Sequence, residues 1–140
     1  MHCARIADLG GNTIVVHWYN TTKTNLHKVW DVNVIETALN RFYKDDLSTM
    51  INAIKLNLTN EWCKEENQWA ACYTRTTTCA DKYAEESAEL SCPAYVGAEQ
   101  GSDLEALPIV EKRIAQGGVR LGAILNQIFS GKSNSRIQSS

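Results

Sequence analysis

The sequence predicts a mostly α-helical protein of one domain, with one short β element near its N-terminus. Two observations favour helices: apolar residues recur at steps of three and four from Leu26 to Leu58, and again from Ile109 to Phe129. A third observation locates the β element, because β-branched and aromatic residues are concentrated in Thr13–Tyr19. No internal repeat and no linker divides the 140 residues, which have the length of one ordinary domain.

The N-terminal part is expected to form a loop, a strand and a turn. The segment Ala7–Asn12 contains two adjacent glycines and is expected to be the loop. Thr13–Tyr19 is the predicted strand. The polar stretch Asn20–Asn25 is expected to be a turn that leads into the first helix.

The central part is expected to form three helices. The apolar pattern that starts at Leu26 is interrupted at Lys44–Ser48, which predicts two helices with a break between them. Asn60–Thr78 is polar, contains cysteines and is expected to be a loop. Asp81–Cys92 is rich in Ala, Glu, Lys and Leu and predicts a helix that ends before Pro93, because a residue that precedes proline disfavours the helical conformation.

The last helix is expected to begin at Pro108, because proline is well suited to the first helical turn. Gly117 and Gly118 lie inside its apolar pattern, where each glycine costs about 1 kcal/mol relative to alanine. We therefore expect another backbone to approach this helix closely at the two glycines. The polar residues 130–140 are expected to be a flexible tail.

Composition excludes several classes of protein. Hydrophobic residues make up 44% and charged residues 21% of the chain, which is typical of a globular protein and not of a disordered one. The 14 basic and 16 acidic residues give a net charge of −2, which excludes a protein that binds nucleic acid simply by being basic. No apolar run is long enough to span a bilayer.

The cysteines and two glycosylation sequons favour a secretory route over the cytosol. The chain has five cysteines, and the spacing of Cys72 and Cys79 fits a short disulfide loop, whereas the paired cysteines of a zinc ribbon are absent from the sequence. Asn20 and Asn57 each begin a sequon. The sequence that starts at Met1 has no signal peptide, so we expect that the chain has lost its front end.

His27 and Asp31 are the candidate metal ligands. They are four positions apart, so on a helix their side chains share one face, and an imidazole with a carboxylate suits zinc. Zinc would need at least one more protein ligand, for which His2 is the candidate. Taken alone, such a pair is more often a hydrogen-bonded pair at the surface than a metal site.

The segments around this pair resemble one family over nearly the whole chain, up to about Phe129. They are similar to the zinc-dependent single-strand nucleases of plants, the bifunctional or class I endonucleases related to mung bean nuclease, with the fungal S-one and P-one nucleases as more distant members. The matching segments, in order, are Met1-His2, Asp8–Ile14, His17–Tyr19, Asn25–Asp31, Ile35–Leu39, Trp69, Lys82–Ser87 and Leu107–Leu121.

The resemblance implies a multi-helix fold of the zinc nuclease and phospholipase C type, with a trinuclear zinc cluster. It implies hydrolysis of single-stranded DNA and RNA to 5′-phosphorylated products, together with 3′-nucleotidase activity. His2, His27 and Asp31 match family residues that bind one and the same zinc. Asn12 matches a residue of the pocket that holds the nucleobase next to the scissile bond, and Gly11 would let that base approach closely. The resemblance further implies a secreted or vacuolar monomer without a membrane partner.

The same resemblance implies that part of the family domain lies outside this sequence. The family's other zinc ligands precede the position of Met1, so residues 1–129 are expected to be the C-terminal half of a zinc nuclease domain that supplies ligands for one zinc. The alternative is a truncated, non-catalytic remnant that binds at most one zinc or needs a partner half. Cys72 and Cys79 match the family's short disulfide loop, and Cys92 matches a cysteine that bonds to the N-terminal half.

Other prominent residues are expected to be structural. His17 is expected to be an ordinary strand residue, and the tryptophans Trp18, Trp30, Trp62 and Trp69 are expected to anchor the core or the loops. Lys112, Arg113 and Arg120 are expected to form a solvated helix face or ion pairs rather than a track for phosphates.

Overall fold

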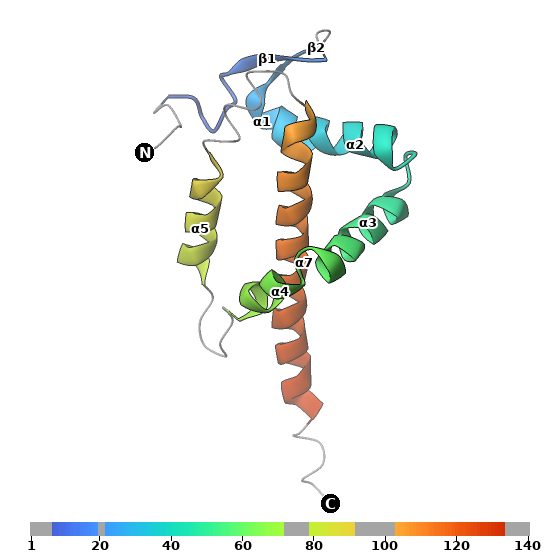
Figure 1. Ribbon diagram of the computed structural model, residues 1–140. Coiled ribbons are helices and arrows are strands. Elements are labelled where there is room, and N and C mark those ends of the chain that lie inside the picture. Colours follow the sequence, from blue (N-terminus) through green and yellow to red (C-terminus); the bar gives the residue numbers. More distant parts are fainter. Residues whose placement is uncertain (1–6, 20–21, 72–78, 92–102, 134–140) are drawn as a thin grey trace, which may run out of the picture.

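The computed structural model describes residues 7–19, 22–71, 79–91 and 103–133. Figure 1 shows the long helix α7 (Asp103–Ser133) in the centre, with a β-hairpin across its N-terminal end and shorter helices on both sides. The predicted mostly α-helical fold with a short β element is confirmed. Within the described segments, no helix combines the length and the apolar character needed to cross a bilayer.

The β element is an antiparallel hairpin of two strands, β1 (Val15–Trp18) and β2 (Thr22–Asn25). β1 confirms the predicted strand, but β2 occupies most of the polar stretch that was expected to be a turn. In β2, threonine alternates with polar residues, and β-branched threonine suits a strand once a neighbouring strand supplies the hydrogen bonds. Val15 pairs with Asn25 in this register, so the hairpin leads directly into the first helix.

The segment from Leu26 to Phe42 is one continuous helical stretch with a change of winding inside it. It comprises α1 (Leu26–Lys28), the π-helical segment η1 (Val29–Asn33) and α2 (Val34–Phe42). The side chain of Asn25 caps its start by accepting a hydrogen bond from the backbone N–H of Lys28 at 2.8 Å.

The predicted break between the first two long helices is confirmed. Lys44 and Asp45 have positive φ values of 55° and 58°, which end the helical path after α2. Asp46 then caps α3 (Leu47–Asn60), because its carboxylate accepts a hydrogen bond from the backbone N–H of Ser48.

The segment that was expected to be a loop from Asn60 to Thr78 contains a helix, α4 (Cys63–Ala70). Its residues are mostly polar, which is why the sequence pattern does not reveal it. Trp62 and Trp69 are both buried at the two ends of α4, and their ring centroids lie 6.2 Å apart. Packing of the two indoles therefore stabilises α4 although it has few apolar residues. The next helix, α5 (Ala80–Glu89), confirms most of the predicted helix, while Cys92 lies outside the described residues.

α7 corrects three expectations. It begins at Asp103, so Pro108 lies in its interior rather than in its first turn. The helix extends in front of the proline because Ala106 and Leu107 pack against the core. A Cβ atom added at Gly117 or Gly118 would meet nothing within 4 Å in the described part of the chain, so the predicted close approach of another backbone is not found there. α7 also continues to Ser133, past the expected start of the tail at residue 130.

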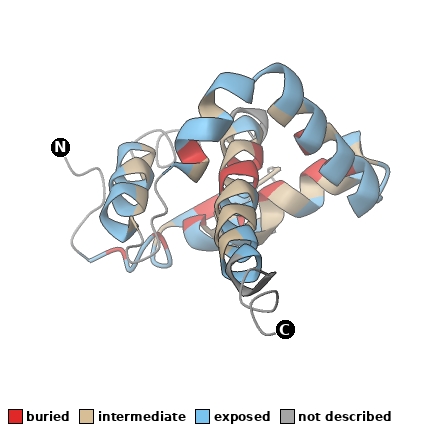
Figure 2. Cartoon of the chain, turned by 90° about the horizontal axis from the view of Figure 1, so that it is seen from below, coloured by how far each residue is buried: buried red, intermediate tan, exposed pale blue. Residues whose placement is uncertain are grey.

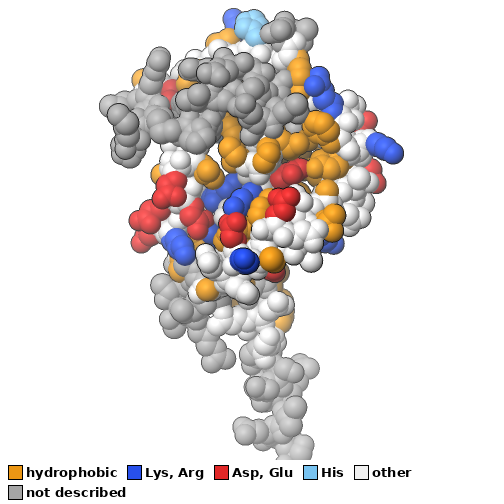
Figure 3. Space-filling model, viewed as in Figure 1, with side chains coloured by type: hydrophobic (Ala, Val, Ile, Leu, Met, Phe, Trp, Pro, Cys, Tyr) orange, Lys and Arg blue, Asp and Glu red, His pale blue; other side chains and the backbone are white. Residues whose placement is uncertain are grey.

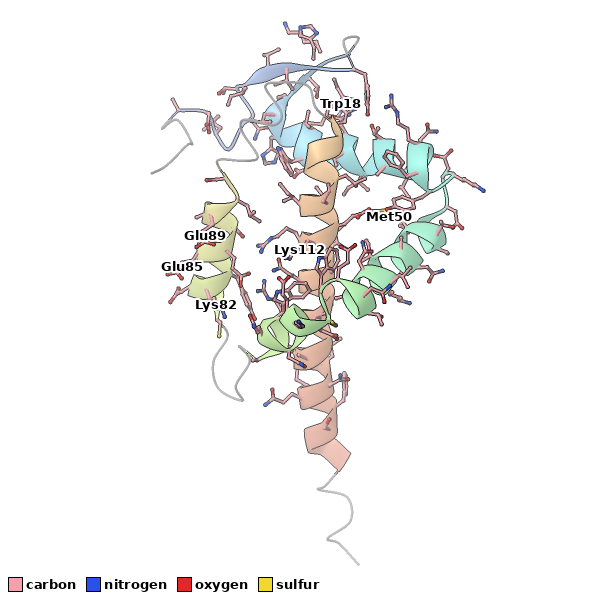
Figure 4. The ribbon with its side chains drawn as sticks, viewed as in Figure 1. Trp18, Met50, Lys82, Glu85, Glu89 and Lys112 are labelled. Atoms are coloured by element: carbon pink, nitrogen blue, oxygen red, sulfur yellow. The ribbon has the colours of Figure 1, made fainter. Side chains whose placement is uncertain are left out.

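Two clusters of buried residues lie along the first half of α7. Buried residues are red in Figure 2. The first cluster joins the hairpin and the α1–η1 stretch to α7, with Trp18 at its edge (Figure 4). Ile35 packs against both clusters, so α2 connects them. The first cluster comprises Val16, Leu26, Val29, Val34 and Val110, and the second comprises Met50, Ile54, Trp62, Trp69 and Ala115.

Candidate metal centre

His27 and Asp31 lie on one face of the α1–η1 stretch, as the sequence predicts. Nε2 of His27 is 3.0 Å from Oδ2 of Asp31, and the side chains are 46% and 59% exposed, so a dissolved ion can reach both. Asp31 lies in the π-helical segment, which the sequence pattern does not indicate. Single π-helical turns inside α-helices occur frequently at functional sites.

The loop before the hairpin folds into a tight turn around the carboxylate of Asp8. Oδ1 of Asp8 accepts hydrogen bonds from the backbone N–H groups of Gly10 at 2.9 Å and Gly11 at 3.3 Å. Gly10 and Gly11 have φ values of +68° and +90°, a region that glycine reaches without steric cost. The expected loop at Ala7–Asn12 is therefore confirmed as an ordered turn.

This turn contacts the start of the helix at His27. The carbonyl oxygen of Gly10 is 3.0 Å from Nδ1 of His27, and the carbonyl oxygen of Gly11 accepts from the backbone N–H of His27 at 3.4 Å. A carbonyl oxygen can only accept a hydrogen bond, so the Gly10 contact requires the ring proton on Nδ1. Nε2 of a neutral ring then carries the free lone pair and faces Asp31.

The donor set fits a zinc ion. With the proton on Nδ1, both Nε2 and the Asp31 oxygen present lone pairs to each other, which requires a positive centre between them: a second ring proton or a metal ion. Two ligands of a tetrahedral zinc lie roughly 3.4 Å apart when their bonds are about 2.0–2.2 Å long. The observed separation of 3.0 Å is shorter and lies within hydrogen-bond range, so a bound zinc ion would move the two atoms slightly apart. A carbonyl oxygen that receives the other ring N–H is the usual support of a zinc-binding histidine.

The expected third ligand, His2, lies outside the described residues. Among the residues that the structure describes, no group of three or more His, Cys, Asp or Glu side chains is placed to hold one metal ion. The described part of the site therefore consists of His27 and Asp31, and the assignment of His2 stays a prediction.

The two predicted substrate-binding residues lie in the same turn. Asn12 is exposed, and its Nδ2 donates to the carbonyl oxygen of Leu9 at 3.0 Å. Gly11 is buried, and a Cβ atom added to it would lie 3.2 Å from the backbone nitrogen of His27. The structure thus places both residues in the turn that contacts His27, while their contact with a nucleobase stays a prediction.

The other predicted modification residues are only partly described. Cys72 and Asn20 lie outside the described residues. Cys79 lies at the start of α5 and is not a free cysteine, whereas Cys63 is free and exposed. Asn57 is half-buried in α3. The disulfide and the two glycosylation sites stay predictions.

An ion-pair network joins α5 to α7, which confirms the expected structural role of two arginines. Glu86 is bound by Arg120 at 2.6 Å and by Arg113 at 3.3 Å, and Arg120 also stacks on the ring of Tyr83 at 4.0 Å. Burial opposes ionisation of Glu86, but hydrogen bonding and charge from Arg120, then from Arg113, outweigh it and lower its pKa. Lys112 forms a further pair with Glu65 at 2.7 Å. On the face seen in Figure 3, basic side chains in blue lie beside acidic ones in red near the centre of the molecule.

A helical domain with a histidine–aspartate pair held beneath a diglycine turn defines a candidate metal-dependent protein. The sequence profile of the S1/P1 nucleases matches residues 1–130, and the chain belongs to this family.

Named relatives are endonucleases of Arabidopsis thaliana. Endonuclease 4 is 48% identical over 139 residues, which cover 94% of this chain and 46% of the relative. Endonuclease 2 is 48% identical over 136 residues, with 92% and 46% covered, and Endonuclease 1 is 43% identical over 138 residues, with 93% and 45% covered. The chain therefore spans slightly less than half the length of each of these relatives.

Proposed function

We propose that this chain is part of a zinc-dependent endonuclease that hydrolyses phosphodiester bonds of single-stranded DNA and RNA to 5′-phosphorylated products and acts as a 3′-nucleotidase. The observation that carries the proposal is the pair His27–Asp31, in which the Gly10 carbonyl leaves Nε2 free to bind a metal ion beside the carboxylate. Membership of the S1/P1 nuclease family supports the reaction class.

His27, Asp31 and His2 would hold one zinc ion of a trinuclear cluster. Zinc bound there supplies a Lewis acid for phosphate oxygens and positive charge that a chain of net charge −2 lacks. Asn12 would contact the edge of the nucleobase, because its exposed side chain lies in the turn that contacts His27.

We further propose that residues 1–129 act as the C-terminal half of a nuclease domain. The relatives are about twice as long as the matched region. The second half of α7 exposes large apolar side chains that the rest of a domain would cover. These residues are Leu121, Leu125, Ile128 and Phe129. The remaining zinc ligands would come from that other part.

The alternative is a non-catalytic chain that binds at most one zinc. An experiment separates the two: the chain is refolded alone, and together with the part of Endonuclease 4 that it does not match. Activity on denatured DNA and phosphate release from a 3′-nucleotide are then measured, with zinc counted per complex.

The proposal expects trace activity and at most one zinc for the chain alone, and EDTA-sensitive activity with three zinc ions for the complex. The matched control is the complex with His27→Ala and Asp31→Ala, which should lose activity. A complex that stays inactive supports the remnant, and a complex whose activity resists EDTA or survives the double substitution overturns the zinc assignment.

A secreted or vacuolar monomer with a Cys72–Cys79 disulfide and glycans at Asn20 and Asn57 is part of the proposal. The bonded state of Cys79 supports it, since Cys63 is the free cysteine of the described segments. Mass spectrometry of unreduced peptides from secreted material tests it, because a free thiol at Cys72 would exclude the pair.

A further inference from the structure

We infer that Asp8 is a positioning residue for the zinc ligand His27, acting through the peptide unit between Gly10 and Gly11. The inference rests on the proposed zinc site and adds a positioning residue to it. Asp8 does not contact His27 in the described interactions; the turn lies between the two side chains.

The first step concerns the burial of Asp8. Its side chain belongs to a surface turn, yet Asp8 is only 5% exposed. A buried carboxylate is costly unless hydrogen bonds satisfy it, and Oδ1 accepts from the N–H groups of Gly10 and Gly11. Leu9, Gly10 and Gly11 all have positive φ, so consecutive N–H groups converge on one anionic oxygen. The carboxylate therefore stabilises the conformation of the turn, together with the backbone oxygen of Asp8, which accepts from the N–H groups of Gly11 and Thr13.

The second step is the geometry of one peptide unit. The carbonyl of Gly10 and the N–H of Gly11 belong to the same planar unit and point in opposite directions. The N–H of Gly11 is directed at Asp8, where it meets Oδ1 at 3.3 Å and the backbone oxygen at 3.0 Å. The carbonyl of Gly10 is consequently directed away from Asp8, towards His27.

The third step is the imidazole itself. The Gly10 carbonyl accepts the proton of Nδ1 at 3.0 Å, which sets both the tautomer and the rotation of the ring. Nε2 then faces Oδ2 of Asp31 at 3.0 Å, so both donor atoms are directed at the position of a shared zinc ion. Zinc-binding histidines often donate directly to a carboxylate; here the carboxylate acts one peptide unit away.

The test compares zinc affinity and ring tautomer in the full chain with substitutions at Asp8. Asp8→Ala removes both acceptor contacts, Asp8→Ser shortens the side chain so that it cannot reach both N–H groups, and Asp8→Asn keeps an acceptor oxygen. Asp46→Ala is the matched control, because Asp46 also accepts from a backbone N–H, that of Ser48, and a hydroxyl, that of Thr49, but caps α3.

Two measurements are made on each variant. Zinc Kd is determined by competition with a chelator, and the 15N shifts of the His27 ring report the tautomer without metal, at a pH where the ring is neutral. We expect Asp8→Ala to weaken zinc binding by about tenfold or more and to lose the Nδ1–H tautomer. Asp8→Ser should lie between Asp8→Ala and the parent chain, whereas Asp8→Asn and Asp46→Ala should keep both values.

A folded Asp8→Ala chain with unchanged zinc Kd and unchanged tautomer overturns the inference. If Asp8→Ala does not fold by circular dichroism, the same result for Asp8→Ser overturns it. A parent chain that binds no zinc, either alone or in the complex with the missing part of the domain, refutes the proposed metal site, while the tautomer measurement still decides the role of Asp8. The two failures are therefore distinguishable.

Discussion

Replacement of Gly11 by alanine is expected to separate the diglycine turn from the helix that carries His27. The residue has a φ of +90°, and its missing side chain leaves room for the start of α1. A Cβ atom at this position would lie 3.2 Å from the backbone nitrogen of His27 and 3.2 Å from Cβ of Leu26. Neither neighbour is the flexible end of a long side chain, so the backbone has to move.

The magnitude follows from two contributions. A non-glycine residue in the left-handed region costs about 1–2 kcal/mol. Forcing an extra methyl group into a packed site costs typically about 1–3 kcal/mol. This cost applies here because Leu26 is packed into the first buried cluster. We expect Gly11→Ala to lower the free energy of unfolding by about 2–5 kcal/mol.

Gly10→Ala is the matched control. Gly10 also has a positive φ, of +68°, but an added Cβ would meet only Nδ1 of His27, at an ordinary contact distance of 3.7 Å. The conformational cost of about 1–2 kcal/mol therefore remains, without the clash.

The assay is urea unfolding of the full chain, followed by tryptophan fluorescence and circular dichroism. The reasoning requires Gly11→Ala to be less stable than Gly10→Ala by at least about 1 kcal/mol. Equal stabilities would mean that the turn does not lie against α1 as described, and the route from Asp8 to His27 would lose its support.

Two further predictions concern contacts of α7. The hydroxyl of Tyr43 donates to the buried carboxylate of Glu111, and burial, followed by the hydrogen bond and charge of Glu111, raises the pKa of Tyr43 from 10.0 to about 12. This stabilisation is complete below pH 10 and is lost as pH rises to 12. Tyr43→Phe should therefore lower the free energy of unfolding at pH 8 by about 2 kcal/mol. In urea unfolding, the difference in stability between Tyr43→Phe and the parent chain should shrink between pH 10 and 12, and a constant difference would contradict the assignment. The pKa of Glu86 is lowered, so its ion pairs with Arg113 and Arg120 stabilise the chain above the pKa of about 4.5 that Glu86 has in the unfolded chain. This stabilisation is lost as the pH falls and Glu86 becomes protonated. Glu86→Gln should cost about 1–2 kcal/mol at pH 7 in urea unfolding and much less at pH 3, whereas an equal cost at both values would show that charge is not involved.

The sequence predicts the helices whose apolar spacing is regular and misses the elements that depend on tertiary contacts. α4 is mostly polar, and its signal is the spacing of Trp62 and Trp69, which are seven positions apart and therefore share a helical face. β2 depends on pairing with β1, because threonine and lysine alone do not distinguish a strand from a turn. The open surroundings of Gly117 show that propensity alone is a weak guide to packing.

For the candidate site, the spacing of His27 and Asp31 is sufficient to predict the pair. The spacing does not predict which ring nitrogen faces the aspartate, because that depends on a backbone carbonyl 17 positions away in the sequence. The role of Asp8 is hidden for the same reason, since a buried carboxylate and an exposed one look alike in a sequence. Contacts between backbone groups that fold together from separate segments leave no residue-type signal.

The exposed pair His27–Asp31 is held in place by its buried neighbours. Along the α1–η1 stretch, Leu26 and Val29 are both buried in the first cluster, while His27 and Asp31 point to solvent. Close packing on one face prevents the helix from rotating about its axis. The side chains of His27 and Asp31 on the opposite face therefore point in a fixed direction. Val110 of α7 also belongs to that cluster, so the central helix contributes to the geometry of the pair. Among the described residues, α7 supplies no further ligand to it. The position of the ligands thus follows from apolar packing on one side and from the Gly10 carbonyl on the other.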